Sequence, residues 1–189
     1  MRKLILLMHV SLDGFVAGPN GEMDWIKVDD EMFDVVGRFT AESDAALYGR
    51  KTFQMMEQYW PTAGDQPNAS KHDKDHSAWY KRVEKFVASS TMNSSVTPNT
   101  TFISKNVPSE IRRVKGTVGK NILMIGSPGI VHSLLPHGLI DEYRLFINPI
   151  ILGSGIPLFM NNEHRSVLTL AETTPFASGV IGLHYRVIK

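Results

Sequence analysis

The sequence predicts an α/β fold built on one mixed, mostly parallel sheet that carries helices on both faces. Short apolar runs alternate with segments of helical periodicity up to about residue 140, and this alternation is typical of a parallel sheet covered by helices. After Asp141, three apolar runs follow one another with no helical segment between them. Antiparallel strands are therefore expected at the C-terminal side of the sheet.

Each expected element rests on a local pattern. Residues 4–10 form an almost continuous apolar run, as expected for a strand buried on both faces. Asp29 or Asp30 can cap a helix whose apolar side chains recur at helical spacing as far as Phe39. The same patterns predict strands at 45–48, 85–88, 101–104 and 121–125, and helices at 52–58, 79–83, 110–114 and 130–135.

Residues 60–75 are polar and contain Pro61, Gly64 and Pro67, which predicts a long surface loop. The last strands are expected at 143–152, 167–173 and 180–188. No internal repeat and no linker rich in Gly, Ser or Pro divides the chain, so we expect a single domain over residues 1–189.

The composition excludes several classes of function. The chain has 189 residues, 42% hydrophobic and 21% charged, with a net charge of +1. Such a balance gives no global reason to expect nucleic acid or a membrane as a partner. With no cysteine, the chain cannot form disulfides, a thiolate zinc site or a cysteine nucleophile. A cytoplasmic location is expected.

Two glycine turns are the strongest indication of function. Gly49 and Gly126 each join an apolar run to a helix-like segment, and the first N–H groups of such a helix can bind an anion. Two phosphate cradles in one domain suggest a dinucleotide. Arg50 and Lys51 add positive charge to the first turn, which favours a phosphorylated nicotinamide cofactor.

Both turns also have a purely structural interpretation. Glycine often serves only a tight turn, and basic residues beside it are often solvated surface. Neither turn matches the G-x-G-x-x-G fingerprint or a P-loop. The interpretation as a cofactor site therefore depends on the two turns together.

Carboxyl groups near the first strand are candidates for substrate binding and catalysis. Asp13 follows this strand, at an edge where ligands bind in open α/β sheets, although Asp13-Gly14 also makes a good turn without any ligand. Asp30 lies close in sequence to Trp25, and a carboxyl beside an apolar wall is suited to deliver a proton. The alternative is that Asp30 only stabilises the N-terminus of a helix by its interaction with the helix dipole.

The histidines give weaker indications. His72 and His76 are four residues apart, but the segment lacks the Glu of H-E-x-x-H and no third ligand is evident. No metal is therefore expected. His9, near the end of the first strand, is interpreted either as a core histidine or as part of a substrate site.

The same positions carry a resemblance to a known family. The sequence resembles the dihydrofolate reductase superfamily, and within it the reductase domain of riboflavin biosynthesis, of the RibD C-terminal type. The match covers essentially the whole chain. The motifs that carry it, in the family's order and spacing, are Ser11–Ala17, Tyr48–Phe53, Gly126–Gly129, Gly138–Tyr143 and Pro149–Gly155.

This resemblance implies a three-layer α/β/α domain, hydride transfer from NADPH, a small-molecule substrate and a homodimer paired through the C-terminal strands. The spacing from Trp25 to Asp30 equals that between the family's tryptophan and its catalytic acid, with Asp29 and Glu31 leaving the register open. The implied substrate-binding residues are His9, Ser11, Asp13 and Trp25. The implied cofactor-binding residues are Ala17, Gly49, Arg50, Lys51, Thr52, Ser89, Ser90, Gly126, Ser127, Gly129 and Ile130.

The chain also departs from the folate enzymes. It has Gly126-Ser127 where they have two glycines, Gly129 where they have arginine, and no proline-rich segment before Trp25. Without cysteine it cannot carry the zinc deaminase signature that often accompanies the riboflavin reductase. The expected activity is an NADPH-dependent reduction similar to that of 5-amino-6-(5-phosphoribosylamino)uracil reductase. The alternatives are reduction of dihydrofolate or another small carbonyl or heterocycle, and nucleotide binding without turnover.

Overall fold

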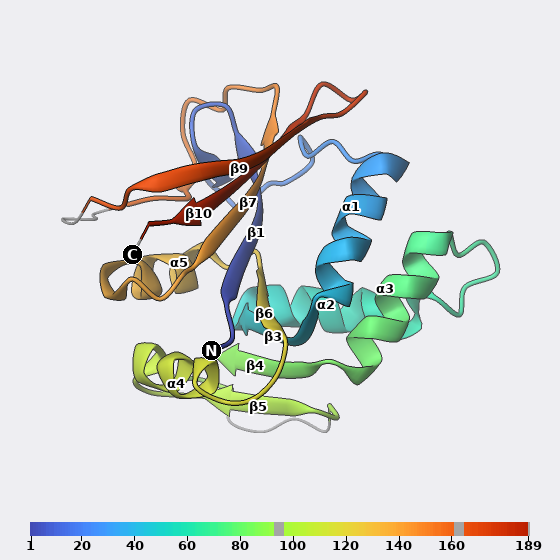
Figure 1. Ribbon diagram of the computed structural model, residues 1–189. Coiled ribbons are helices and arrows are strands. Elements are labelled where there is room, and N and C mark those ends of the chain that lie inside the picture. Colours follow the sequence, from blue (N-terminus) through green and yellow to red (C-terminus); the bar gives the residue numbers. More distant parts are fainter. Residues whose placement is uncertain (93–96, 161–164, 189) are drawn as a thin grey trace.

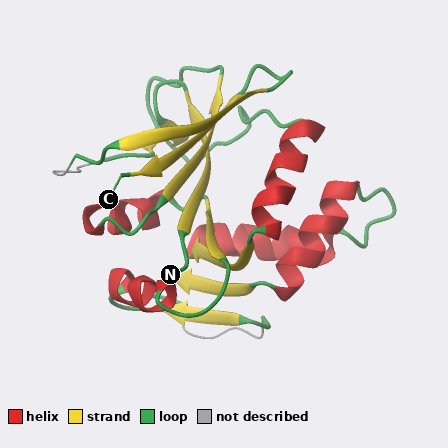
Figure 2. Cartoon of the chain, viewed as in Figure 1, coloured by secondary structure: helices red, strands yellow, loops and turns green. Residues whose placement is uncertain are grey.

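The computed structural model describes residues 1–92, 97–160 and 165–188 and has the expected α/β architecture (Figures 1 and 2). The strands are β1 (Leu4–Ser11), β2 (Phe15–Ala17), β3 (Ser43–Gly49), β4 (Glu84–Ala88), β5 (Thr100–Ile103), β6 (Asn121–Ile125), β7 (Glu142–Asn148), β8 (Ile156–Pro157), β9 (Leu168–Pro175) and β10 (Ile181–Val187). The helices are α1 (Asp30–Ala41), α2 (Arg50–Ala63), α3 (Lys71–Arg82), α4 (Val107–Lys115), α5 (Pro128–Leu134) and the 3-10 turn Leu135–His137.

The main sheet has eight strands in the order β5-β4-β3-β6-β1-β7-β10-β9. The first six are parallel, with β1 paired to β6 on one side and to β7 on the other. β10 is antiparallel to β7, and β9 is antiparallel to β10. The prediction of a mostly parallel sheet with antiparallel C-terminal strands is confirmed.

Helices cover both faces of this sheet, so the predicted three-layer arrangement is also confirmed. Met32 of α1, Phe53 of α2 and Trp79 of α3 pack with Ile5 on one face. Side chains of α4 and α5, such as Val131, pack with Leu4 and Leu6 on the other. In Figure 1 the first three helices lie to the right of the sheet and the other two to its left. Among the described residues, none of the helices is both long and apolar enough to cross a bilayer.

The prediction of a loop over residues 60–75 is wrong. Helix α2 continues through Pro61 to Ala63, and α3 begins at Lys71, well before the expected short helix at 79–83. Ser70 starts α3 with a capping box, in which its hydroxyl accepts from the backbone N–H of Asp73. Polar composition concealed this helix because only its inner face is buried.

Two further differences lie near the carboxyl ends of the strands. The strand expected at 143–152 ends at Asn148, because Pro149 has no N–H to continue the ladder. The short strands β2 and β8, which the sequence did not predict, form a separate two-stranded sheet beside β1.

Candidate active site at the carboxyl ends of the strands

The two glycine turns lie side by side at the carboxyl edge of the sheet. Their strands, β3 and β6, are parallel neighbours although they are far apart in sequence. The helices that follow, α2 and α5, pack on opposite faces of the sheet. In open α/β sheets, a ligand site forms where chains leave adjacent strands toward opposite faces. This arrangement places both predicted cradles at one such point.

The Ser127 hydroxyl joins the two turns directly. Its Oγ accepts a hydrogen bond from the Gly49 N–H at 2.8 Å and donates one to Thr52 Oγ1 at 2.9 Å. Gly126 and Ser127 both have positive φ, +65° and +68°, a region that glycine tolerates better than serine. The Gly49 N–H and the Ser127 hydroxyl thus have protein partners, and they fix the spacing of the turns.

Other N–H groups at the turns remain available to an anion. No side chain caps α2, so its first-turn N–H groups have no partner within the helix. At the second turn, by contrast, the N–H groups of Ile130 and Val131 already donate to the Ser127 carbonyl. A Cβ added to Gly129 would meet no atom within 4 Å, whereas one at Gly126 would lie 3.4 Å from Thr52.

The remaining predicted cofactor residues surround these turns. Arg50 and Lys51 are exposed, and Arg50 makes only a 3.3 Å contact with Gln54 in the described structure. Ser89 follows Ala88, the register partner of Gly49 at the end of β4, and its Oγ accepts from the N–H groups of residues 91 and 92. Ser90 is exposed beside it. Ala17 is buried in β2 and pairs with Ile156.

Asp13 holds a neighbouring loop in place. Its carboxylate accepts from the Ser11 hydroxyl at 2.6 Å and from the N–H groups of Leu152 and Gly153 at 3.1 and 2.7 Å. The Ser11 hydrogen bond, with the two backbone N–H groups, holds the pKa of Asp13 below its usual value. The structure therefore gives Asp13 and Ser11 a positioning role in the β1 turn, and substrate binding by them stays a prediction.

The two aspartates at the start of α1 have different surroundings. Asp29 is the N-cap, and its Oδ1 accepts from the Met32 N–H at 2.8 Å, which holds the pKa of Asp29 below its usual value. Asp30 is the first residue of the helix and is exposed. Trp25 is half-buried, and its ring N–H donates to the Glu22 carbonyl at 3.1 Å.

A residue that the sequence did not predict, Asn148, lies between these groups. Its side chain is fully buried at the end of β7. It contacts His9 of β1 and the Lys27 N–H in the segment between Trp25 and α1. A polar side chain that ends an apolar strand just before a proline is the feature of the sequence that could have indicated it.

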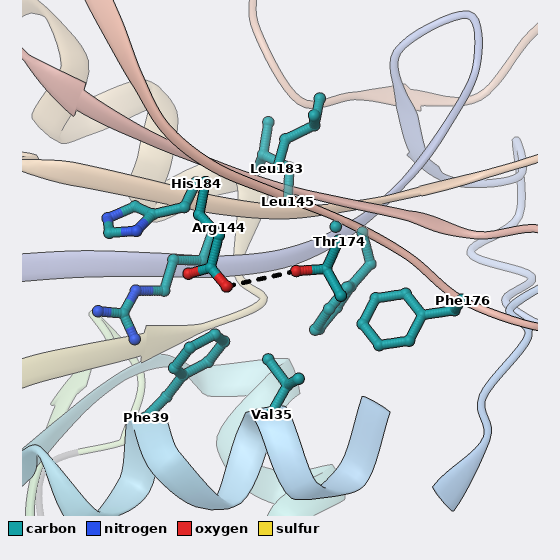
Figure 3. Close-up of a pocket in the computed structure, with 11 residues that line it drawn as sticks. Val35, Phe39, Arg144, Leu145, Thr174, Phe176, Leu183 and His184 are labelled. Carbon is teal, nitrogen blue, oxygen red and sulfur yellow. Dashed lines mark hydrogen bonds between the residues drawn. The ribbon is translucent and has the colours of Figure 1, made fainter. Parts of the chain in front are cut away.

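His72 and His76 lie on one face of α3, with ring centroids 5.4 Å apart. No group of three potential metal-ligating side chains occurs among the described residues. A hollow of about 450 Å³ runs between α1 and α3, beside these rings. Figure 3 shows a smaller one, about 20 Å³, between α1 and β7, β10 and β9, where Arg144 stacks on Phe39 at 4.0 Å. Neither hollow includes the glycine turns.

Comparison with known proteins identifies a family and a sequence relative that match this chain. Residues 2–181 match the RibD C-terminal domain family. The uncharacterized protein YyaP of Bacillus subtilis (strain 168) is 36% identical over 187 residues, which are 98% of this chain and 95% of YyaP.

Solved structures share the fold. A Shewanella sp. PV-4 protein, whose name places it in riboflavin biosynthesis, matches with a TM-score of 0.73 and 22% identity over 99% of both chains. A Thermotoga maritima protein named as a diaminohydroxyphosphoribosylaminopyrimidine deaminase and 5-amino-6-(5-phosphoribosylamino)uracil reductase matches with a TM-score of 0.67 and 15% identity, over 99% of this chain and 57% of that one. From the family match and the sequence relative together, the chain belongs to the RibD C-terminal domain family.

Proposed function

We propose that this protein is an NADPH-dependent reductase of a ribosylaminopyrimidine phosphate or a closely related heterocycle. The observation that carries the proposal is the pair of glycine turns, which Ser127 joins at the point where α2 and α5 leave for opposite faces. The family supports a reductase, and the Thermotoga maritima protein of the same fold bears the name of a pyrimidine reductase.

The residues present fit a dinucleotide. The uncapped start of α2 and the open space above Gly129 leave backbone N–H groups for two phosphates. Arg50 and Lys51 are exposed next to the first of these, where a guanidinium can bind a third phosphate with two parallel hydrogen bonds. Such contacts select NADPH over NADH.

The chemistry divides between cofactor and protein. Bound NADPH would supply a hydride to a carbon–nitrogen or carbon–oxygen double bond of the substrate. The protein's part is to hold the two molecules together, to limit water at the reacting carbon and to deliver a proton to the heteroatom. Asp30 is the proposed proton donor, and Trp25, His9, Ser11 and Asp13 are the proposed boundary of the substrate site.

A cofactor titration tests the proposal directly. We expect the purified chain to bind NADPH more tightly than NADH, and Arg50→Ala to weaken NADPH binding about tenfold or more while changing NADH binding little. Arg112→Ala, which removes an exposed arginine from α4, is the matched control. If Arg50→Ala weakened the binding of NADPH and NADH equally, Arg50 would not contact the extra phosphate of NADPH.

Turnover is tested separately with a panel of ribosylaminopyrimidine, pterin and carbonyl compounds. We expect NADPH oxidation with the pyrimidine and little with dihydrofolate. Binding of NADPH without oxidation across the panel would contradict the reductase proposal and favour a nucleotide-binding protein.

A further inference from the structure

The buried amide of Asn148 has only one possible orientation. Its Oδ1 lies 2.9 Å from the Lys27 backbone nitrogen, and its Nδ2 lies 3.1 Å from the Phe146 carbonyl oxygen. A backbone N–H can only donate and a carbonyl can only accept. The two backbone partners therefore determine which atom of the Asn148 amide is oxygen and which is nitrogen.

The oriented amide determines the protonation of its neighbour. Asn148 Nδ2 lies 3.4 Å from His9 Nδ1, and because an amide NH₂ only donates, Nδ1 must present its lone pair. Burial lowers the pKa of His9 to about 4, so the ring is neutral near neutral pH. The single ring proton of His9 is then on Nε2.

His9 Nε2 is free to meet a ligand. It has no hydrogen-bond partner among the described residues, and it is not fully buried. His9 is two residues from the end of β1, and its ring lies against Phe146 at 5.0 Å. The same amide that orients His9 also holds Lys27, in the segment between Trp25 and the aspartates of α1.

We propose that His9 is a neutral Nε2–H donor that recognises a carbonyl oxygen on the substrate heterocycle, and that Asn148 is the positioning residue that sets this state. This inference rests on the proposed reductase function and adds a substrate preference to it. An oxo group facing His9 satisfies the donor, whereas an amino group at the same position places two donors against each other. Such a mismatch lowers affinity about tenfold or more.

The tautomer can be observed without any turnover. In the uniformly ¹⁵N-labelled full chain near neutral pH, long-range ¹H–¹⁵N correlation should show His9 with an unprotonated Nδ1 and a protonated Nε2. The His9 signals are identified by their loss in His9→Gln or, if that variant does not fold, by through-bond correlation from the backbone. A protonated Nδ1 in the parent protein would overturn the inference.

Ligand addition then tests recognition. Among matched oxo- and amino-pyrimidine ribosides, the oxo compounds should shift the His9 Nε2–H resonance, and the amino compounds should shift it less at equal concentration. No shift with any of them, or the reverse order, would overturn the donor role. A shift without NADPH oxidation would leave the donor role standing and contradict only the proposed reductase function.

Two substitutions separate donor geometry from simple packing. Glutamine places its amide nitrogen near the position of Nε2, and asparagine places its own near Nδ1. We expect His9→Gln to keep KM within about threefold and His9→Asn to raise KM about tenfold, with kcat less affected. His137→Gln, at an exposed histidine, is the control. Equal KM values for the two His9 variants would contradict the proposal.

Discussion

Two adjacent aspartates, Asp29 and Asp30, have different surroundings at the start of α1, and this difference separates a structural role from the proposed catalytic one. The Asp29 carboxylate is committed to the Met32 N–H as the helix cap. Asp30 makes no side-chain hydrogen bond in the described structure and is exposed. A cap requires a hydrogen-bond acceptor but not a charge, since asparagine caps as well as aspartate. Replacing each aspartate by asparagine therefore tests only its ionisation.

We expect Asp30→Asn to leave the melting temperature unchanged and to lower turnover about 10²- to 10⁴-fold, the usual contribution of a general acid. Asp29→Asn is the matched control and should retain both stability and activity, whereas Asp29→Ala should cost about 1 kcal/mol of unfolding free energy. Thermal melting and steady-state NADPH oxidation measure the two effects. Turnover by Asp30→Asn within about twofold of the parent would exclude Asp30 as the proton donor.

A second residue-scale prediction concerns His76, which is 5% exposed and has no hydrogen-bond partner for either ring nitrogen. Burial lowers the pKa of His76 to about 3, against about 6.5 in the unfolded chain. Between these values the unfolded state binds the proton and the native state does not, so the unfolding free energy must fall as the pH decreases below about 6.5.

His76→Phe keeps an aromatic ring beside Trp60, whose ring centroid is 3.9 Å away, and removes the titrating group. Urea unfolding at several pH values should therefore show a smaller loss of stability at low pH for His76→Phe than for the parent. His137→Gln, at an exposed histidine, serves as the control. An unchanged pH dependence in His76→Phe would mean that His76 does not titrate as its burial requires.

At the same scale, sequence reasoning named candidate site residues but not the partners of their side chains. The resemblance marked Ser127 and Gly49 as cofactor residues, yet the Ser127 hydroxyl bonds to the Gly49 N–H across 78 positions of sequence. Asn148 was missed because its role depends on Lys27 and His9, which are distant in the chain. Such long-range pairs leave no periodic pattern in a sequence.

At the scale of elements, apolar runs predicted strands well because the sheet core consists of them. The part of helix α3 before Trp79 was missed because its buried side includes His76 and Ser77, which look polar in a sequence. The Ser70-x-x-Asp73 capping box was visible and could have located its start. Strands β2 and β8 are too short to show a period of two.

The start of α5 provides an element-scale prediction. Gly129 has no positive φ, and a Cβ there meets no atom within 4 Å, so Gly129→Ala should leave stability unchanged or slightly higher. If a pyrophosphate approaches this backbone, the added methyl group should weaken NADPH binding about tenfold or more. Calorimetric titration of NADPH, with melting as the control for folding, measures both.

Gly126→Ala is the contrasting variant, because it forces an L-residue into a left-handed conformation and should cost about 1 kcal/mol of stability even without cofactor. Normal NADPH affinity in a well-folded Gly129→Ala would mean that the second turn serves only the fold.

At the scale of the whole molecule, the two ends of the sheet are open edges, and β9 forms the longer one. Within the described part of the chain no strand pairs with the outer side of β9. Nearby, Val167, Leu170 and Ile188 are 64%, 51% and 58% exposed. An exposed edge of this length favours pairing with another chain. By contrast, β7, another of the C-terminal strands, lies between β1 and β10, so its apolar character already has an explanation within one chain.

We therefore propose that the expected homodimer forms through β9, which would extend the sheet across two copies. Leu170→Lys should yield monomers, because a charged side chain on an edge strand opposes strand addition. Met55→Lys, which changes another exposed apolar residue on α2, should not. Light scattering at micromolar concentration should give twice the 21.1 kDa chain mass for the parent and for Met55→Lys, and the chain mass for Leu170→Lys. A monomeric parent would refute the dimer, and a dimeric Leu170→Lys would place the contact elsewhere.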